Sequence, residues 1–345
     1  MKLFSPHFCS VFLFLFAAAH SSAQRTQLRL ATANDALLRN DLKAFYMPTS
    51  LTARPPESGS YGFVRNSRDF GEAGSFYTRF HEGLDIRPLH RNASKIPTDV
   101  VRPIMNGTVA YVNSAASRSN YGKYVVVRHD WGFGPLHSLY AHLASTSVEV
   151  GQQVTGNTAL GVIGSTGAGL NNARAHLHLE LNIVMSERFN DWIKYELKSS
   201  NGHGNFNGIN MAGMDLAGLF VKLKQDPNLN FAKWVHSTPQ YFRVTVPRKG
   251  KGALPIVQRY RWMRFGNHDK PSASWEMAFS QSGFLIGVAP SDRKVDQPTV
   301  TYVRNSKVDH KHRTIGKLTG KGSSATLTAS GKRFINLVTD NFNRG

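Results

Sequence analysis

The stretch "AHLHLELNI", residues 175–183, has the apolar pattern of a β-strand and carries two histidines two positions apart. Side chains at positions i and i+2 of a strand point to the same face, so His176 and His178 should project side by side. Two interpretations are open at this point. The pair is either two imidazoles on a solvated sheet face or one half of a metal site, and the rest of the chain has to decide.

A second group of possible metal ligands occurs in "FHEGLDI", where His81 and Asp85 lie four positions apart. Two histidines and a carboxylate suit a catalytic zinc site, because three protein ligands leave a fourth position for water. Zinc in such a site lowers the pKa of its water to about 7 and polarises a carbonyl oxygen. A His-x3-Asp pair also arises by chance, and spacing alone singles out no ligand in the β segment. The histidines between positions 123 and 183 are His129, His137, His142, His176 and His178.

Short apolar or alternating runs between Gly- and Asn-containing turns predict β-strands through residues 61–183. Residues 186–236 differ, because "ERFNDWIKYEL" (187–197) and "MDLAGLFVKLKQ" (214–225) have helical spacing. After Pro239 we again predict strands. They are "QYFRVTVP" (240–247), "LPIVQRYRWMRF" (254–265), "SWEMAFSQSGFLIGVAP" (274–290), "TVTYVRN" (299–305) and "ATLTASGKRFINLV" (325–338). The fold class is therefore mainly β, with an antiparallel core, a helical insertion after it and a small β-rich C-terminal module.

The first 23 residues predict a secretory signal peptide. Lys2 precedes the apolar run "VFLFLFAAA", and "HSSAQ" places the cleavage after Ala23. The run is too short to span a membrane, and no other transmembrane candidate is present, so we expect an exported, soluble protein in the periplasm, the cell envelope or the medium. Cys9, the only cysteine, lies inside this segment. The mature chain would then have neither disulfides nor thiolate ligands, and a metal would be held by His, Asp or Glu.

The charge of the chain is strongly positive. The sequence has 42 Lys and Arg against 22 Asp and Glu, a net charge of +20. Residues 236–345 alone hold 19 basic and 6 acidic residues. Such a balance favours an anionic partner, although it can also serve solubility alone. Because export argues against nucleic acid, we expect the partner to be an anionic cell-wall polymer that the C-terminal module binds.

Four motifs in order, "HEGLDI", "YAHL", "VGQQVTGNTALGVIGSTG" and "HLHLEL", resemble the lysostaphin/LytM-type zinc metallopeptidases of bacterial cell walls (peptidase family M23). The resemblance covers residues 61–184. It implies an antiparallel β core with a groove walled by loops (the duplicated hybrid motif fold), a Zn²⁺ ion bound by His81, Asp85 and His178, and His142 and His176 as catalytic histidines that do not bind the metal. It implies cleavage of peptide bonds in the cross-links or stem peptides of peptidoglycan. Glu180, on the same strand face, is either a partner that fixes a ligand's tautomer or a solvated carboxylate.

The sequence departs from the family pattern in two places, both expected near the groove. "STGAGLNNARAHLHLEL" (165–181) is longer than the usual turn and has Arg174-Ala175 in place of Gly-Pro, and "LHRNASKIPTDVV" (89–101) is extra. His90 lies in the second segment and is interpreted as a loop residue. Residues 186–236 have no counterpart in the family core. Their "NGHGNFNGIN", with His203, is a groove wall, a lid or simply a structural loop.

These observations predict five segments: a signal peptide (1–23), a lead-in (24–58), a zinc metallopeptidase β domain (59–185), a helical segment (186–236) and a basic β-rich module (237–345). The predicted function is that of an exported zinc endopeptidase that hydrolyses peptidoglycan. Two alternatives remain: a non-catalytic wall-binding or regulatory protein on the same scaffold, and a zinc peptidase that acts on proteins.

Overall fold

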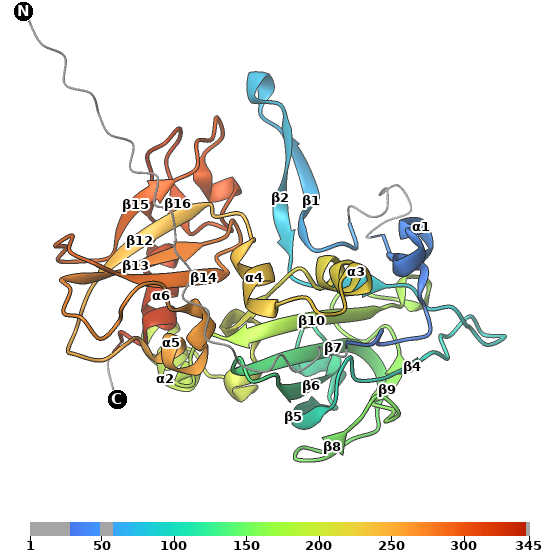
Figure 1. The fold of residues 1–345 in the computed structure, drawn as a ribbon. Helices are drawn as coiled ribbons and strands as arrows, with labels where there is room; N and C mark the ends of the chain where they lie inside the picture. Colours follow the sequence, from blue (N-terminus) through green and yellow to red (C-terminus); the bar gives the residue numbers. More distant parts are fainter. Residues whose placement is uncertain (1–27, 49–57, 343–345) are drawn as a thin grey trace, which may run out of the picture.

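The computed structural model describes residues 28–48 and 58–342, so the predicted signal peptide lies outside the described residues. The central sheet and the four-stranded sheet of the C-terminal module lie side by side, with the helices packed between and around them (Figure 1). The predicted mainly β fold is confirmed. No helix in the described part of the chain is long and apolar enough to cross a membrane.

The central sheet has nine strands, and all of its pairings are antiparallel. Its strands are β3 (Leu84–Ile86), β4 (Val100–Val101), β5 (Gly107–Asn113), β6 (Lys123–Asp130), β7 (Pro135–Thr146), β8 (Gln153–Val154), β9 (Gly161–Ile163), β10 (Leu177–Val184) and β11 (Met211–Gly213). Every residue of β10 is buried, although its sequence alternates. His178 lies in this strand, His176 lies immediately before it, and both are buried, so the interpretation of the two histidines as groups on a solvated face is wrong.

A long hairpin stands away from the central sheet (Figure 1). It consists of β1 (Gly62–Asp69) and β2 (Ser75–His81). The base of the hairpin carries His81, and its tip contacts the C-terminal module. At the tip, the ring of Phe70 lies 5.1 Å from that of His312, and the guanidinium of Arg313 lies 4.8 Å from the centre of the Phe76 ring.

The helical insertion is present, and its two predicted helices are confirmed as α2 and α3. The helices of the described chain are α1 (Leu42–Phe45), α2 (Phe189–Leu197), α3 (Leu216–Gln225), α4 (Phe231–His236), α5 (Pro255–Arg259) and α6 (Ala329–Thr339). Asp215 caps α3, because its side chain accepts a hydrogen bond from the backbone N–H of Gly218.

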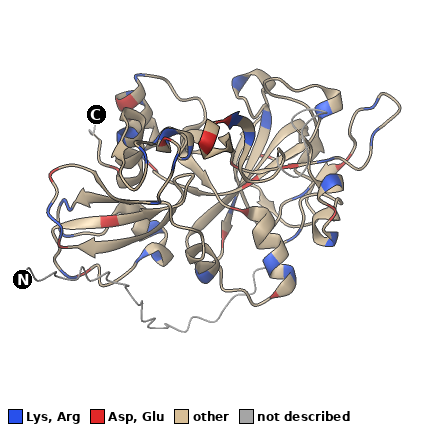
Figure 2. Ribbon diagram, turned by 90° about the horizontal axis from the view of Figure 1, so that it is seen from above, with Lys and Arg blue, Asp and Glu red and all other residues tan. Residues whose placement is uncertain are grey.

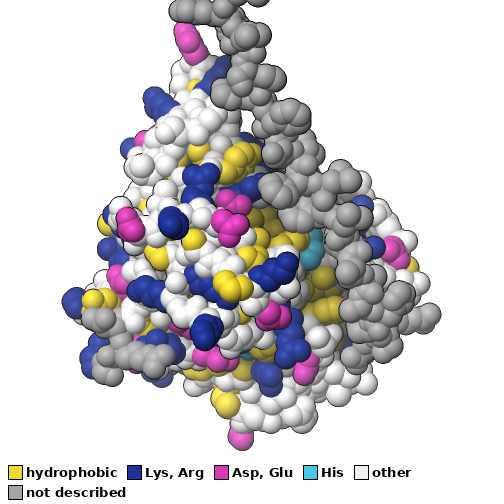
Figure 3. All heavy atoms as spheres, turned by 60° about the vertical axis from the view of Figure 1, so that its left-hand side comes forward, with side chains coloured by type: hydrophobic (Ala, Val, Ile, Leu, Met, Phe, Trp, Pro, Cys, Tyr) yellow, Lys and Arg dark blue, Asp and Glu magenta, His cyan; other side chains and the backbone are white. Residues whose placement is uncertain are grey.

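The C-terminal module is built on an antiparallel sheet of four strands in the order β14-β13-β12-β15. Its strands are β12 (Phe242–Pro247), β13 (Ser274–Phe279), β14 (Leu285–Ser291) and β15 (Thr299–Val303), and a separate pair is formed by β16 (Leu318–Thr319) and β17 (Thr326–Leu327). Lys and Arg residues are distributed along the chain in this part of the molecule (Figure 2), and many of their side chains lie on the face that Figure 3 shows.

Two predicted strands of this module are helices. Residues 254–265 form α5 and a following 3₁₀ turn, because Pro255 occupies the first turn of a helix, where its missing N–H costs nothing. Most of residues 325–338 form α6. The Thr328 hydroxyl accepts from the N–H of Gly331, and the buried Gly331, Ile335 and Val338 recur with helical spacing. Both segments are apolar enough for strands; Pro255 favours the helix in the first, and the cap at Thr328 favours it in the second.

One hydrophobic core runs through the described chain from the lead-in to α6. Phe45 and Tyr46 of the lead-in are buried in it. Tyr260 joins the module to the central sheet: its hydroxyl donates to the carbonyl of Pro135 and accepts from the N–H of Val184, both at 3.0 Å. The parts of the other four predicted segments that the structure describes therefore pack together as one body.

Candidate metal centre and active site

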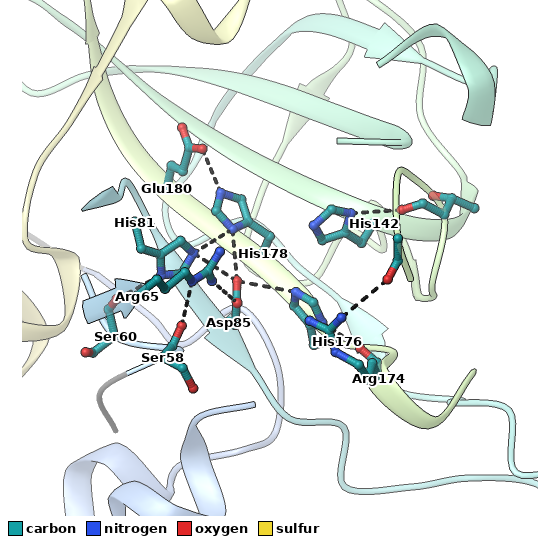
Figure 4. Close-up of polar contacts among 12 residues, drawn as sticks. Ser58, Ser60, Arg65, His81, Asp85, His142, Arg174, His176, His178 and Glu180 are labelled. Atoms are coloured by element: carbon teal, nitrogen blue, oxygen red, sulfur yellow. Dashed lines mark hydrogen bonds and ion pairs between the residues drawn. The ribbon is translucent and has the colours of Figure 1, made fainter. Parts of the chain in front are cut away.

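Three side chains from three different strands meet at the base of the hairpin (Figure 4). Nε2 of His81 lies 3.1 Å from Nδ1 of His178, and each of these nitrogens lies 3.0 Å from Oδ1 of Asp85. All three side chains are buried. The structure thus brings together the three residues that the sequence motifs proposed as metal ligands.

Strand register places the two ligands of β3 and β10 side by side. Asp85 pairs directly with His178 across the two antiparallel strands. Gly83 makes this close approach possible, since a Cβ atom there would lie 2.6 Å from the carbonyl oxygen of Leu179 and 2.8 Å from Cγ of Glu180. His81 is added from the end of β2, two residues before that glycine.

Hydrogen bonds at the far side of each ring set the tautomers of the two histidines. Nδ1 of His81 lies 2.8 Å from the carbonyl oxygen of Ser60, which can only accept, so Nδ1 carries the proton and Nε2 faces the cluster with a lone pair. Nε2 of His178 lies 2.7 Å from the carboxylate of Glu180, so this nitrogen donates and Nδ1 faces the cluster. Outer-shell carboxylates and carbonyls orient metal-binding imidazoles in this way.

Glu180 is a buried partner of His178 and not a solvated carboxylate, since only 1% of it is exposed. The hydroxyl of Tyr121 donates to the same carboxylate oxygen at 2.7 Å, and the amide of Asn182 donates to the other oxygen at 2.8 Å. Sequence spacing gave no signal for Tyr121, whose ring also lies 5.6 Å from that of His178.

The donor set fits a zinc ion. In these tautomers two imidazole lone pairs and one carboxylate oxygen point at the same place, and no proton lies between them. Such electron-rich atoms repel one another, and a cation bound between them stabilises the arrangement. Ligand atoms at about 2.0–2.1 Å from a tetrahedral zinc lie about 3.4 Å apart, close to the spacing within the cluster. His81, Asp85 and His178 would hold the ion.

Arg65 of β1 contacts the cluster from the hairpin, and the sequence did not point to it. Its guanidinium donates to Oδ2 of Asp85 and, through Nε, to the carbonyl oxygen of Ser58 at 2.8 Å. The two oxygens of Asp85 therefore have separate roles, with Oδ1 turned to the histidines and Oδ2 held by the arginine.

The two histidines proposed as catalytic lie beside the cluster, with their rings 4.9 Å apart. His142 donates from Nδ1 to the carbonyl oxygen of Thr166 at 2.8 Å, and His176 donates from Nδ1 to the carbonyl oxygen of Arg174 at 2.7 Å. Nε2 of each ring is therefore not committed to the backbone, and Nε2 of His176 lies 3.3 Å from Oδ1 of Asp85.

His142 sits in a conformation that few residues other than glycine adopt. Its φ is 60°, at a place where the register between β6 and β7 shifts, and its backbone N–H donates to the carbonyl oxygen of Tyr121 at 2.9 Å. Strained backbone of this kind concentrates at functional sites, where the surrounding structure holds it. Here the bulge turns the ring of His142 toward His178, with ring centres 5.7 Å apart.

Burial and neighbouring charges control protonation at the site. Burial, together with the charges of His176 and His178, lowers the pKa of His142 to about 3, so the ring is neutral at pH 7. Burial alone would lower the pKa of His178, but its hydrogen bonds to Asp85 and Glu180 outweigh burial and raise it. Burial alone would raise the pKa of Asp85, yet the adjoining histidines hold it well below its usual range.

A cavity of about 1100 Å³ opens onto the cluster. Arg174 of the unusual turn lines it, as do Gly208 and Ile209 of the helical segment, which is therefore a wall of the groove. His203 has a structural role, since its ring nitrogens lie within hydrogen-bond distance of the Tyr111 hydroxyl (2.9 Å) and the Arg118 carbonyl (3.0 Å).

The other sequence departures are only partly near the groove. Residues 89–101 are absent from the cavity lining and instead contact the unusual turn, where Arg91 donates to the carbonyl oxygen of Asn172 at 2.7 Å. His90 is exposed in this loop, as predicted. His129 and His137 are buried away from the cavity lining, and burial lowers the pKa of each, to about 4 and about 3 respectively.

Part of the predicted β domain matches a known protein family. Residues 79–190 match the model of peptidase family M23. Among solved structures, the chain is similar to a zinc-containing peptidase from Vibrio cholerae (24% identity over 40% of this chain and 36% of that one, TM-score 0.26). It is also similar to the catalytic domain of the antimicrobial peptidase lysostaphin from Staphylococcus simulans (19% identity, 47% and 89%, TM-score 0.28). A third is a putative peptidase M23 from Pseudomonas aeruginosa (26% identity, 42% and 53%, TM-score 0.24).

Among curated proteins no sequence matches. The chain spans only about a third of the length of the Vibrio cholerae peptidase. The family match includes all three residues of the cluster together with His142 and His176. Residues 79–190 of this chain therefore match peptidase family M23, the family that the four sequence motifs indicated.

Proposed function

We propose that this protein is an exported, zinc-dependent endopeptidase that hydrolyses peptide bonds in peptidoglycan. The observation that carries the proposal is the convergence of three metal-binding atoms within 3.1 Å of one another, beside two further histidines and at the wall of a cavity. The family match supports a peptidase, and the predicted signal peptide and the basic C-terminal module support an anionic wall polymer, not nucleic acid, as the partner.

A zinc ion held by His81, Asp85 and His178 would act as a Lewis acid toward water and the scissile carbonyl. His142 is neutral at pH 7, so its Nε2 can accept the proton of an attacking water molecule. His176 lies beside it, and a proton on its Nε2 can stabilise the negative charge that develops on the carbonyl oxygen. The backbone carbonyls of Thr166 and Arg174 hold both rings in the required orientation.

Digestion of isolated wall sacculi tests this proposal. The purified mature protein should release muropeptides, release should stop with a chelator, and added Zn²⁺ should restore it. Mass spectrometry of the products identifies the bond that is cleaved. Release that a chelator does not affect, or no release from any wall type, contradicts the proposal. Bound zinc without release would favour the non-catalytic alternative, and cleavage of a Gly-rich protein but not of sacculi would favour a protein-directed peptidase.

A further inference from the structure

The cavity at the metal cluster extends beyond residues 79–190, which match the family, and reaches the C-terminal module. Its lining includes the turn between β13 and β14, at Ser282 and Gly283, together with Lys317 and part of α6 at Arg333. A substrate lying in this cavity would touch both parts of the molecule.

A short series of contacts connects the cluster with this far wall. Glu82 follows His81 in the sequence. The carbonyl oxygen of Glu82 lies so close to Gly213 that a Cβ atom on Gly213 would be 2.4 Å from this oxygen. The carbonyl oxygen of Gly213 accepts a hydrogen bond from the Tyr61 hydroxyl at 2.9 Å. Burial raises the pKa of that hydroxyl, an effect that the neighbouring Ser282 side chain opposes. The far wall therefore begins only a few side chains away from the metal ligands.

Lys317 is held at this wall without a carboxylate partner among the described residues. Its ammonium donates to the carbonyl oxygen of Ser282 at 2.9 Å and lies 4.9 Å from the centre of the Phe334 ring. One hydrogen bond leaves two of its three N–H donors for a ligand. Burial lowers its pKa to about 8, as expected for an ammonium that lacks a counter-charge.

Arg333 is the second cation at this wall. In the described chain its guanidinium forms no ion pair. Its backbone carbonyl accepts a hydrogen bond from the indole N–H of Trp192 at 3.0 Å. Its neighbour on α6, Phe334, is the ring against which Lys317 packs, and both cations line the same cavity.

The charges that line the cavity are unbalanced. The acidic residues are Glu82 and Asp85, and Asp85 is paired with Arg65. The basic residues are Arg65, Arg79, Arg174, Lys317 and Arg333. An excess of cations on concave walls attracts an anionic ligand and raises its local concentration.

We propose that Lys317 and Arg333 form a subsite that binds a carboxylate of the substrate peptide at a distance from the bond to be cleaved. This inference rests on the proposed function and names its substrate class, a peptide with a free carboxylate. The module then contributes to substrate selection inside the cavity, in addition to any contact that its outer surface makes with the wall.

Binding of soluble muropeptides tests the subsite separately from hydrolysis. The probe is a muropeptide pool released from sacculi by a muramidase, either native or with its carboxylates converted to amides. The full-length protein carries His142→Ala, so that bound peptide is not cleaved. We expect the native pool to bind about tenfold more tightly than the amidated pool, because a hydrogen bond between charged groups is lost on amidation.

Lys317→Met and Arg333→Met should each reduce this preference, and the double variant should bring it close to one. Lys332→Met is the matched control, because Lys332 carries the same charge on the same helix but is exposed and does not line the cavity. The proposal is overturned if the double variant still prefers the native pool over the amidated pool as strongly as the wild-type cavity does. It is also overturned if Lys332→Met reduces this preference by the same factor. If Lys317→Met does not fold, Arg333→Met decides alone. Failure of the proposed function would appear differently, as intact sacculi after digestion with the wild-type protein.

Discussion

Replacement of Glu180 by Gln should weaken zinc binding although Glu180 does not touch the metal. The carboxylate accepts from Nε2 of His178 at 2.7 Å and so leaves Nδ1 as the ligand atom. The amide of Gln can accept from the same nitrogen, but without a negative charge. A hydrogen bond to a charged group contributes about 1.5–3 kcal/mol and one between neutral groups about 0.5–1.5 kcal/mol. The difference, about 1–1.5 kcal/mol, corresponds to a roughly tenfold increase in the Kd for zinc.

The surroundings of Glu180 can accommodate this change without other damage. Asn182 donates to Oε2 of Glu180, and its own Oδ1 is buried without a hydrogen-bond partner in the described structure. If the amide of Asn182 turns over, Oδ1 accepts from the new Gln amide. The Tyr121 hydroxyl keeps an oxygen acceptor, so thermal unfolding of the variant should resemble that of the wild type.

Competition with a chromophoric chelator measures the Kd of the purified proteins. Glu82→Gln is the control, because Glu82 adjoins His81 and lines the same cavity but has no hydrogen bond to a metal ligand in the described chain. An unchanged Kd in Glu180→Gln, or the same increase in Glu82→Gln, would refute the argument that Glu180 sets the tautomer of His178.

Three further predictions concern the cluster and its support. Asp85→Ala should lose bound zinc, measured by metal analysis, and should no longer release muropeptides. His142→Ala should keep its zinc and lose about 10²–10⁴-fold in turnover. Equal loss of metal in the two variants would contradict this division of roles. Zinc affinity should rise with pH through the neutral range, because the raised pKa of His178 makes a proton compete for Nδ1; calorimetry in two buffers should show about one proton released from it. Tyr260→Phe should lower the free energy of unfolding by about 1–3 kcal/mol in urea titrations, since the Val184 N–H loses its acceptor; no change would mean that water replaces the hydroxyl.

The site was largely predictable where it depends on local sequence. Strand alternation alone predicts that His176 and His178 project to the same side, and the order of the motifs indicates which residues accompany them. The role of Glu180 does not follow from the sequence, because the same alternation describes a solvated carboxylate and a buried one. Burial of β10 on both faces decides this question, and it results from packing against segments far away in the sequence.

Other features could not be predicted because they depend on tertiary contacts. Arg65 reaches Asp85 because the pairing of β1 with β2 places it near the base of the hairpin, beside the cluster. The bulge that gives His142 its positive φ depends on the register between two strands, which no single segment determines. In the C-terminal module, the apolar content of residues 325–338 satisfies both the strand and the helix pattern, and the cap at Thr328 selects the helix α6.

The hairpin gives a physical reason why the C-terminal module is packed against the family domain and is not merely tethered to it. The base of the hairpin supplies His81 to the cluster and Arg65 to Asp85. Its tip is held through Phe70 and Phe76 by residues 312–313 of the module. A two-stranded hairpin is marginally stable by itself, so contacts at both ends restrict its position. The geometry of the metal ligands therefore depends partly on contacts that the module makes at the far end of the hairpin.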